Sequence, residues 1–338
     1  MILVGDIVPQ DAQFESPDFG DELVLGNLEG PVCRGGLKPI EKVGIHLHSV
    51  PFNLRGRWAF TLANNHFMDF NAEGMRETFA FLNGQGFSFG GAGDNEGTAR
   101  QTLWLSENGR KIAVICCCEH QFGVAGPDTA GVAAQGIWVI DSIGAAREQG
   151  ADIVIVSSHA GSESTKLVSP RLQALYHGWI DAGADIIHGH HAHVPQGWEI
   201  YKGKPIFYGL GNFIVKETDW RNDSNQLWSL VVKLNISGDR FDWEVEPFGV
   251  VPEDWQSYIK DANSIFADAE VMKVRWLDNA LVQYDRYYKT FIDFSIRQIV
   301  YWIMHPWRMR LVRQNFSQCE NHIDIIRTAK ERMLRNAK

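Results

Sequence analysis

Short apolar runs alternate with amphipathic segments along the first 215 residues, and this alternation limits the possible folds more than any other feature. The apolar runs have the length of buried strands and cover residues 2–4, 23–25, 58–62, 112–117, 153–157, 184–187 and 205–208. Between several of them, apolar side chains recur at helical spacing in residues 72–82, 136–149 and 170–182. Strands that alternate with helices are typical of α/β proteins, in which helices cover the faces of sheets. The sequence therefore predicts a layered α/β fold.

Two hairpin signals and a change of composition divide the chain into two units. Asn108-Gly109 joins two apolar runs with a dipeptide that favours hairpin turns, and residues 227–236 and 241–248 predict a second hairpin. After about Pro252 glycine almost vanishes, and helical patterns run to the end of the chain. We therefore expect an α/β domain at residues 1–250 and a helical, basic and aromatic extension at residues 251–338.

The charge of the chain is acidic but unevenly distributed. Its formal net charge is -9, whereas a general nucleic-acid-binding protein carries a basic face, so we expect no nucleic-acid partner. Residues 297–338 hold nine Lys/Arg against three Asp/Glu, a local charge of +6 that leaves -15 for the rest. The acidic body and the basic tail are therefore expected to have different partners.

The cysteines and the start of the chain bear on the compartment. Cys116, Cys117 and Cys118 are consecutive in an apolar run, where neighbouring side chains point to opposite faces, so disulfides among them are not expected. Unpaired cysteines are typical of a reducing compartment. The residues after Met1 show neither a basic segment nor a long apolar stretch. We expect a cytoplasmic protein, with a peripheral contact at the inner face of the membrane as a further possibility.

Side chains of the types that can bind metal ions follow six of the seven predicted strands. In chain order they are Asp6, Asn27, Glu29, Asn64, Asn65, His66, Asp69, His159, Glu163, His190, His191, His193 and Asn212. Ligand sites of open α/β sheets gather outside the carboxyl ends of the strands, so these side chains are expected to converge. Carboxylates, amides and imidazoles without a thiolate suit Mn, Fe or Zn in a hydrolytic site. The set is large enough for two ions, which together lower the pKa of a water between them towards roughly 7.

Each of these residues also has an ordinary structural interpretation. Asn64 and Asn65 suit a plain turn, and Glu163 is equally consistent with a solvated loop carboxylate. His190 suits a third ligand, a substrate contact or a residue that supports the ligands. His188, directly before the Gly189 turn, is expected to face away from the site.

Six motifs occur in an order that is similar to a known family. They are Gly5-Asp6, Asn27-Leu28-Glu29, Ala63-Asn64-Asn65-His66 with Asp69, His159-x-Gly161-x-Glu163, Gly189-His190-His191-x-His193-Val194 and Gly209-Leu210-Gly211-Asn212-Phe213. Together they resemble the CapA family of poly-γ-glutamate capsule biosynthesis proteins, within the calcineurin-like metallophosphoesterase superfamily. The resemblance covers about residues 1–215. It implies a four-layer α/β/β/α sandwich with two divalent metal ions (Mn, Fe or Zn).

The resemblance also implies roles for individual residues. The implied metal ligands are Asp6, Glu29, Asn65, His159, His191 and His193, with Glu29 as the bridging carboxylate. His66 is implied to contact the scissile phosphate or to protonate the leaving group, and Asp69 and Glu163 are grouped with it as candidate catalytic residues. The candidate supporting or substrate-contacting residues are Asn27, Asn64, His190, Asn212 and His48.

The chain departs from the pattern at several positions. Val8 stands where the superfamily often has a histidine, so weaker binding of one of the two ions is expected. Ala160 and Ala192 stand where a tryptophan and a proline are common, and an arginine often found after the second motif is replaced around residues 46–48. His46 and His48 alternate on an extended segment, which suits a pocket wall or an exposed strand. These changes concern the wall of the site and the choice of substrate.

The ligand pattern predicts a metal-dependent hydrolase, and the resemblance implies one of phosphoesterase type, linked to capsule or exopolymer biosynthesis and acting on a phosphorylated or polymeric small-molecule substrate. The alternative is a poly-γ-glutamate or exopolymer assembly factor that acts on an amide bond or without catalysis, recruited by its C-terminal tail. In that tail, residues 299–310 mix aromatic residues with arginines. They suit packing on the domain or contact with a membrane or a polymer-synthesis complex.

Overall fold

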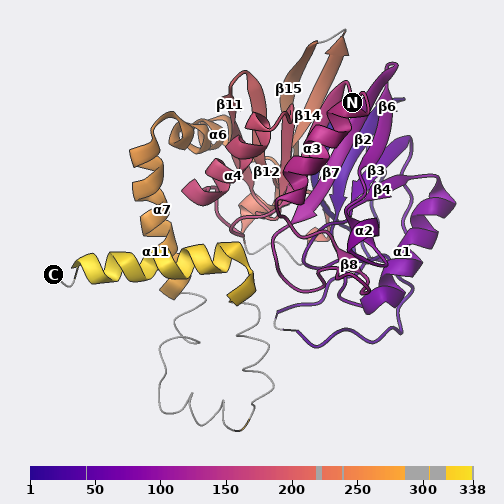
Figure 1. The fold of residues 1–338 in the computed structure, drawn as a ribbon, viewed down its shortest axis with the longest axis horizontal. Coiled ribbons are helices and arrows are strands. Elements are labelled where there is room, and N and C mark those ends of the chain that lie inside the picture. Colours follow the sequence, from indigo (N-terminus) through magenta and orange to yellow (C-terminus); the bar gives the residue numbers. More distant parts are fainter. Residues whose placement is uncertain (43, 218–222, 238–239, 286–303, 305–316, 337–338) are drawn as a thin grey trace.

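The computed structural model describes residues 1–42, 44–217, 223–237, 240–285, 304 and 317–336. Two stacked sheets form its centre, with helices on the outside (Figure 1). The aromatic and arginine-rich segment 299–310 lies outside the described residues apart from Met304.

The first sheet has the strand order β15-β14-β1-β2-β3-β4, and β13 also pairs with β1. Strands β1 to β4 and β13 run parallel to one another, whereas β14 is antiparallel to both β1 and β15. The strands are β1 (Ile2–Val8), β2 (Leu23–Leu28), β3 (Arg57–Thr61), β4 (Ser88–Gly90), β13 (Asn212–Val215), β14 (Trp228–Ser237) and β15 (Arg240–Gly249). The antiparallel pair β14–β15 is the second predicted hairpin.

The second sheet has the order β11-β12-β10-β9-β7-β6. Its central strands are parallel, and the edge strands β6 and β11 are antiparallel. The strands are β6 (Leu103–Glu107), β7 (Arg110–Cys118), β9 (Ile153–His159), β10 (Ile186–His190), β11 (Pro195–Tyr201) and β12 (Lys204–Leu210). Asn108 and Gly109 turn the β6–β7 hairpin with φ of 51° and 74°, the left-handed backbone that this dipeptide favours. Two short strands, β5 (Ala92–Gly93) and β8 (Gly131–Val132), pair separately.

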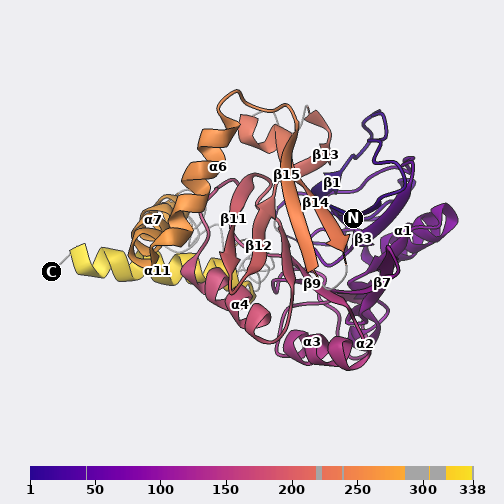
Figure 2. The same cartoon turned by 90° about the horizontal axis from the view of Figure 1, so that it is seen from above.

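Alternate residues of β7 show how the layers pack. Ile112, Val114 and Cys116 belong to the large core cluster that also contains residues of β1 and β2 and extends to helix α1 (Asn71–Gln85). The intervening residues of β7 face helices α3 (Trp138–Glu148) and α4 (Pro170–Asp181) on the other side of the second sheet. The predicted four-layer arrangement of helix, sheet, sheet and helix is confirmed (Figure 2).

Local sequence signals explain where the main helices begin and end. Ser169 caps α4 by accepting a hydrogen bond from the Leu172 N–H, and Pro170 takes the first helical position, which needs no N–H donor. Helix α1 ends at Gly86, whose φ of 74° suits a glycine cap. The predicted helices 72–82, 136–149 and 170–182 are thereby confirmed to within a few residues. Helix α2 (Glu96–Ala99) is a single capped turn.

The described residues after β15 form helices: α6 (Trp255–Ser264), the 3-10 turn η2 (Ile265–Ala267), α7 (Ala269–Gln283) and α11 (Glu320–Asn336). Another 3-10 turn, η1 (Ser224–Leu227), precedes β14. Helix α7 packs against α11 through a small core that includes Trp276, Tyr284 and Ile325. The helical character predicted for the extension therefore holds for its described part, and the domain boundary at residue 250 stays a prediction.

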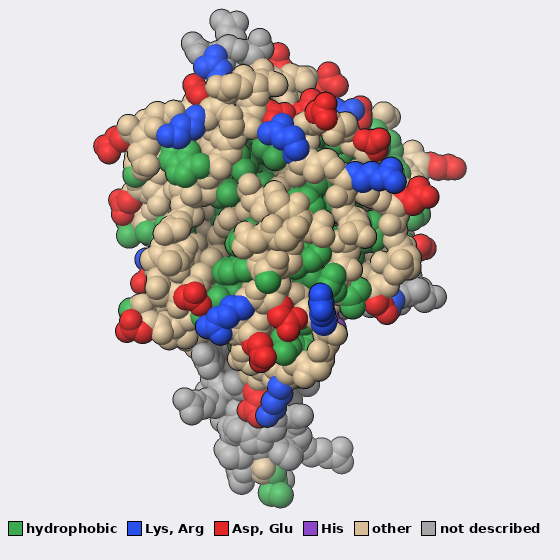
Figure 3. All heavy atoms as spheres, turned by 90° about the vertical axis from the view of Figure 1, so that its right-hand side faces the viewer, with side chains coloured by type: hydrophobic (Ala, Val, Ile, Leu, Met, Phe, Trp, Pro, Cys, Tyr) green, Lys and Arg blue, Asp and Glu red, His purple; other side chains and the backbone are tan. Residues whose placement is uncertain are grey.

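All five cysteines are unpaired and buried. The face that includes α1 mixes acidic and basic side chains around hydrophobic ones (Figure 3). Within the described part of the chain, no helix combines the length and apolar character that crossing a membrane requires.

Candidate metal centre

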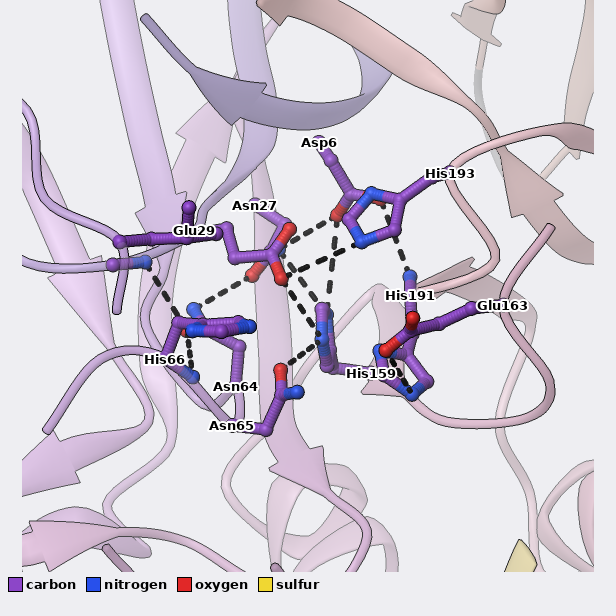
Figure 4. Close-up of polar contacts among 12 residues, drawn as sticks. Asp6, Asn27, Glu29, Asn64, Asn65, His66, His159, Glu163, His191 and His193 are labelled. Carbon is purple, nitrogen blue, oxygen red and sulfur yellow. Dashed lines mark hydrogen bonds and ion pairs between the residues drawn. The ribbon is translucent and has the colours of Figure 1, made fainter. Parts of the chain in front are cut away.

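Strand register brings the predicted ligands of the two sheets to one place. In the first sheet Asp6 of β1 pairs with Asn27 of β2 on one side and with Asn212 of β13 on the other. In the second sheet His159 ends β9 beside His190 of β10. Side chains from both sheets point toward one another at these strand ends (Figure 4). The convergence expected from parallel strands is therefore present.

Two glycines let the strands approach closely enough to form this cluster. A Cβ atom at Gly5 would lie 1.9 Å from the Gly211 carbonyl oxygen, and one at Gly189 would lie 2.1 Å from the Tyr208 carbonyl oxygen. No other residue fits at either position without moving a backbone. The glycines that precede the ligands in two motifs therefore have a structural reason.

The histidine loop after β10 has an unusual backbone. His191 and His193 have φ of 86° and 58°, in the left-handed region that residues with a Cβ rarely adopt. Such strain persists where surrounding contacts maintain it, and it is concentrated at functional sites. Here the His191 N–H donates a 3.3 Å hydrogen bond to Asp6 Oδ2. The loop places the His193 ring beside Asp6 and Glu29, and the His191 ring beside His159 and Glu163 (Figure 4).

All six implied ligands lie in one buried cluster. His193 Nδ1 is 3.4 Å from Asp6 Oδ2, and His193 Nε2 is 3.7 Å from Glu29 Oε1. His159 Nε2 lies 3.7 Å from the same Glu29 oxygen and 2.9 Å from the Oδ1 atom of Asn65. Glu29, His191 and His193 each place one ligand atom within 4.8 Å of the others. The structure thus brings together the whole set that the resemblance implied.

The electrostatics of the cluster suit a cation. Both carboxylate oxygens of Glu29 are buried without a hydrogen-bond partner, and burial raises the pKa of Glu29 to about 8. Burial also lowers the pKa of His191 to about 4, so its ring is neutral at pH 7. Burial opposes protonation of His193 too, but Glu29 and Asp6 outweigh it and raise its pKa to about 10. A buried carboxylate without hydrogen bonds beside a neutral imidazole fits a divalent ion.

Amide side chains hold the oxygen ligands in position. Asn27 Nδ2 donates to Asp6 Oδ1 at 2.7 Å and lies 3.2 Å from His159 Nδ1. Asn64 Nδ2 donates to the Leu28 carbonyl at 2.8 Å, and its Oδ1 accepts from the His66 N–H at 3.2 Å. The two asparagines therefore tie together the strand ends of β1, β2 and β3.

His66 belongs to a second buried group beside the ligands. Its Nδ1 lies 2.7 Å from Asp69 Oδ2, and Lys42 Nζ forms an ion pair with the other Asp69 oxygen. Burial lowers the pKa of His66, partly opposed by its hydrogen bond to Asp69. Lys42 is 2% exposed, and burial lowers its pKa as well. Asp69 therefore orients His66, and Lys42 supplies a positive charge beside both. The sequence did not predict the role of Lys42, because no motif in residues 31–56 distinguishes this lysine.

A cavity of about 380 Å³ opens beside the cluster. Its lining includes Asn65, His66 and His193 from the predicted set, together with Lys42. Glu163, whose side chain is 55% exposed, also lines it with Oε1 3.9 Å from His191 Nε2. His322 of α11 completes the wall. No sequence signal marks His322, because it lies far along the chain from every motif.

The remaining predicted residues take other places. Asn212 Oδ1 lies 3.0 Å from His193 Nδ1, and His190 Nε2 lies 2.9 Å from Ser157 Oγ. His48 packs its ring on Phe70, with centroids 5.0 Å apart, and is not among the residues that line the cavity.

The expected orientation of His188 was wrong. Its Nε2 lies 2.8 Å from the Val4 carbonyl oxygen of the first sheet, and its ring is 4.1 Å from that of His190. Both histidines are inside β10, two residues apart, so they share the face between the sheets.

Comparison with known proteins identifies a family that matches this chain. A family model described as "Bacterial capsule synthesis protein PGA_cap" matches residues 14–217, which is more than half of the chain. The matched region contains every implied ligand except Asp6.

Two curated relatives and one solved structure are similar to the chain. The PGA biosynthesis protein CapA of Bacillus subtilis is 33% identical over 248 residues, covering 70% of this chain and 64% of the relative. A probable polyglutamine synthesis accessory protein of Mycobacterium tuberculosis is 36% identical over 166 residues, covering 45% and 44%. The chain thus spans less than two thirds of either relative. A 5'-nucleotidase precursor from Thermus thermophilus matches with a TM-score of 0.37 and 16% identity over 61% of this chain and 42% of its own, which establishes nothing about activity.

Proposed function

The chain belongs to the bacterial capsule synthesis protein family, and from this premise we propose that it is a metal-dependent hydrolase of phosphoesterase type. Its substrate is a phosphorylated or polymeric small molecule used in the synthesis of capsule or a related exopolymer. The observation that carries the proposal is the buried Glu29 carboxylate, which has no hydrogen bond and faces the rings of His159 and His193.

The residues that would hold two divalent ions (Mn, Fe or Zn) are Asp6, Glu29, Asn65, His159, His191 and His193. When bound, such ions lower the pKa of water and neutralise charge that develops on phosphoryl oxygens. Asn27 and Asn212 contact the proposed ligands Asp6 and His193 directly and would fix their orientation. Asn64 donates to the Leu28 carbonyl next to Glu29, and His190 contacts Ser157 behind the cluster.

His66 is the proposed proton donor to the leaving group. With Nδ1 bonded to Asp69, its Nε2 is the ring nitrogen left for a substrate in the cavity. Burial of the His66 ring lowers its pKa and so disfavours the imidazolium, but an anionic substrate would favour it. His66 is therefore expected to gain its proton in the substrate complex and to give it to the departing oxygen. Asp69 acts through His66, and Glu163 is placed to contact substrate beside His191.

The proposal is tested by metal analysis of the purified protein and by assay on a panel of aryl phosphates with added Mn²⁺. His191→Ala should lower kcat/KM by about a hundredfold or more, because it removes an imidazole ligand. His177→Ala is the matched control, because that imidazole is bonded to Glu199 outside the site. The proposal would be contradicted if the purified protein contained no metal and if the activity with added Mn²⁺ were the same in His191→Ala as in the wild type.

A second candidate function is an assembly factor for poly-γ-glutamate or another exopolymer, acting on an amide bond or without catalysis. It is supported by the word "accessory" in the name of the mycobacterial relative. Recruitment by the C-terminal tail, at a membrane or a synthesis complex, and a location at the inner face of the membrane stay predictions. If His191→Ala restores polymer formation in a deletion strain as well as the wild type does, the non-catalytic function is favoured.

A further inference from the structure

A histidine from the C-terminal extension lies in the wall of the metal pocket. His322 of α11 lines the 380 Å³ cavity with Lys42, His66, Glu163 and His193. It is more than 100 residues beyond the region that the family model matches. One end of α11 lies beside the α/β unit, and its other end projects away (Figure 1). The part of α11 that carries His322 is therefore the part at the site.

The two residues that precede His322 are fixed to the α/β unit. Glu320 accepts hydrogen bonds from the His120 N–H at 2.9 Å and pairs with His120 Nδ1 at 2.7 Å. Buried Asn321 accepts from Ser162 Oγ at 3.1 Å, and Ser162 directly precedes Glu163. These contacts determine where the His322 ring lies relative to the cavity.

The other helices of the extension hold the same loop, which joins β9 to α4 and carries Glu163. Asp261 of α6 forms a 2.6 Å ion pair with Lys166, and Asn279 of α7 accepts a 3.4 Å hydrogen bond from Thr165. With Ser162 held by α11, three helices contact this loop within five residues. The extension is therefore part of the framework of the site.

The charge of the cavity wall indicates what it binds. Lys42 and the imidazoles of His66 and His322 can present N–H donors or positive charge, against the single carboxylate of Glu163 among the titratable wall residues outside the ligand cluster. Charge-assisted hydrogen bonds to anionic oxygens are about twice as strong as neutral ones. An oxyanion fits this wall better than a cation or an apolar group.

We propose that His322 is a substrate-positioning residue, which binds an anionic oxygen group of the substrate, a phosphoryl or carboxylate group, in the cavity beside the ligand cluster. This inference rests on the proposed function, because it assigns the anion to the substrate of that site. The extension would then complete the pocket, in addition to any role in recruitment.

The test uses the full-length Mn²⁺-loaded protein and two probes, inorganic phosphate and glutarate, each titrated by calorimetry. His322→Ala should weaken the binding of one probe by about tenfold, the loss expected for one charge-assisted hydrogen bond. His322→Lys keeps a cationic donor and should stay within about threefold of the wild type. Lys330→Ala removes an exposed cation from the same helix and should change nothing.

Each result decides between definite alternatives. Weaker phosphate binding assigns a phosphoryl group, and weaker glutarate binding assigns a carboxylate. Unchanged binding of both probes by His322→Ala overturns the inference, as does a wild type that binds neither. Metal content and thermal midpoint, measured on every variant, must match the wild type, and loss of Mn²⁺ from His322→Ala would also overturn the positioning role. If probe binding depends on His322 but no aryl phosphate is hydrolysed, the phosphoesterase activity is contradicted while the anion-binding role of His322 stands.

Discussion

The two sheets supply different halves of the proposed metal centre and position them in different ways. The first sheet supplies the proposed oxygen ligands, which are Asp6, Glu29 and Asn65, and the amides of Asn27 and Asn64 tie their strand ends together. The second sheet supplies the imidazoles, two of which sit on left-handed backbone in a loop that follows Gly189. Amide hydrogen bonds to Asp6 and to the Leu28 backbone thus position the strand ends of the oxygen half, and backbone geometry positions the nitrogen half. Mutations in the two halves should therefore have different consequences.

The largest expected effect is on the backbone of the nitrogen half. Gly189→Ala would place a Cβ 2.1 Å from the Tyr208 carbonyl oxygen, so β10 and β12 must separate. We expect a loss of about 3 kcal/mol or more of folding free energy, measured by chemical denaturation. Gly84→Ala is the matched control: its Cβ meets nothing within 4 Å in α1, so it should stabilise by up to about 1 kcal/mol. Equal midpoints for the two variants would refute the backbone explanation.

The oxygen half should respond in metal affinity rather than stability. Asn27→Ala removes the amide that contacts Asp6 and His159, and supporting contacts of this kind are worth about 10- to 100-fold in metal affinity. Competition with a chelator for Mn²⁺ measures the loss. Asn263→Ala, which removes an amide that bonds the Trp198 N–H, tests whether any lost asparagine has this effect. An Asn27→Ala protein with normal Mn²⁺ affinity would show that the amide does not orient the ligands.

The contact between the two halves predicts a pH dependence for the metal-free protein. The pKa of Glu29 is raised to about 8 by burial, and that of His193 is raised to about 10 by Glu29 and Asp6 despite burial. Both groups bind protons more tightly in the folded state, so the stability they contribute is complete below their unfolded pKa values and is lost as pH rises through the folded ones. His191, with its pKa lowered to about 4, acts in the opposite sense below pH 6.5.

We therefore expect the thermal midpoint of the protein in chelator to decrease as the pH is raised from about 7 to about 10. Thermal scans across this range check the fall, and Glu29→Gln should reduce it. Added Mn²⁺ should raise the midpoint most at the alkaline end, because the ligands bind metal in their deprotonated forms. A thermal midpoint that rises with pH in chelator would show that Glu29 and His193 do not bind protons more tightly in the folded state.

The smallest expected effect is at Lys42, which touches neither set of ligands. Its charge helps to lower the pKa of His66, so Lys42→Met should move the pKa of His66 upward in the pH profile of kcat. We expect kcat/KM to fall by about tenfold, since one charge near the substrate is lost. Lys202→Met, at an exposed lysine paired with Asp181, is the control. A pH profile of Lys42→Met that coincides with that of the wild type would show that the charge of Lys42 does not influence the pKa of His66.

The elements and the order of the ligands were predictable because both depend on local pattern. Buried parallel strands appear as apolar runs, and the residues after them fall at one edge of a sheet, so Asp6, Glu29 and His159 could be placed together. The strand β11 was missed, because Pro195 and Gly197 resemble a turn and in fact accompany shifts of its pairing with β12. The error at His188 came from ending the strand three residues early, which changed the face assigned to it.

The sequence by itself determined the layered fold, which follows from the periodicity of apolar residues, and the types and order of the candidate ligands, which follow the ends of parallel strands. The tertiary structure alone decided which further residues reach the cavity. Lys42 lies on an irregular loop, and His322 lies on a helix that is bonded to His120 and Ser162. Such placements depend on contacts between residues far apart in the chain, which leave no periodic signal around Lys42 or His322.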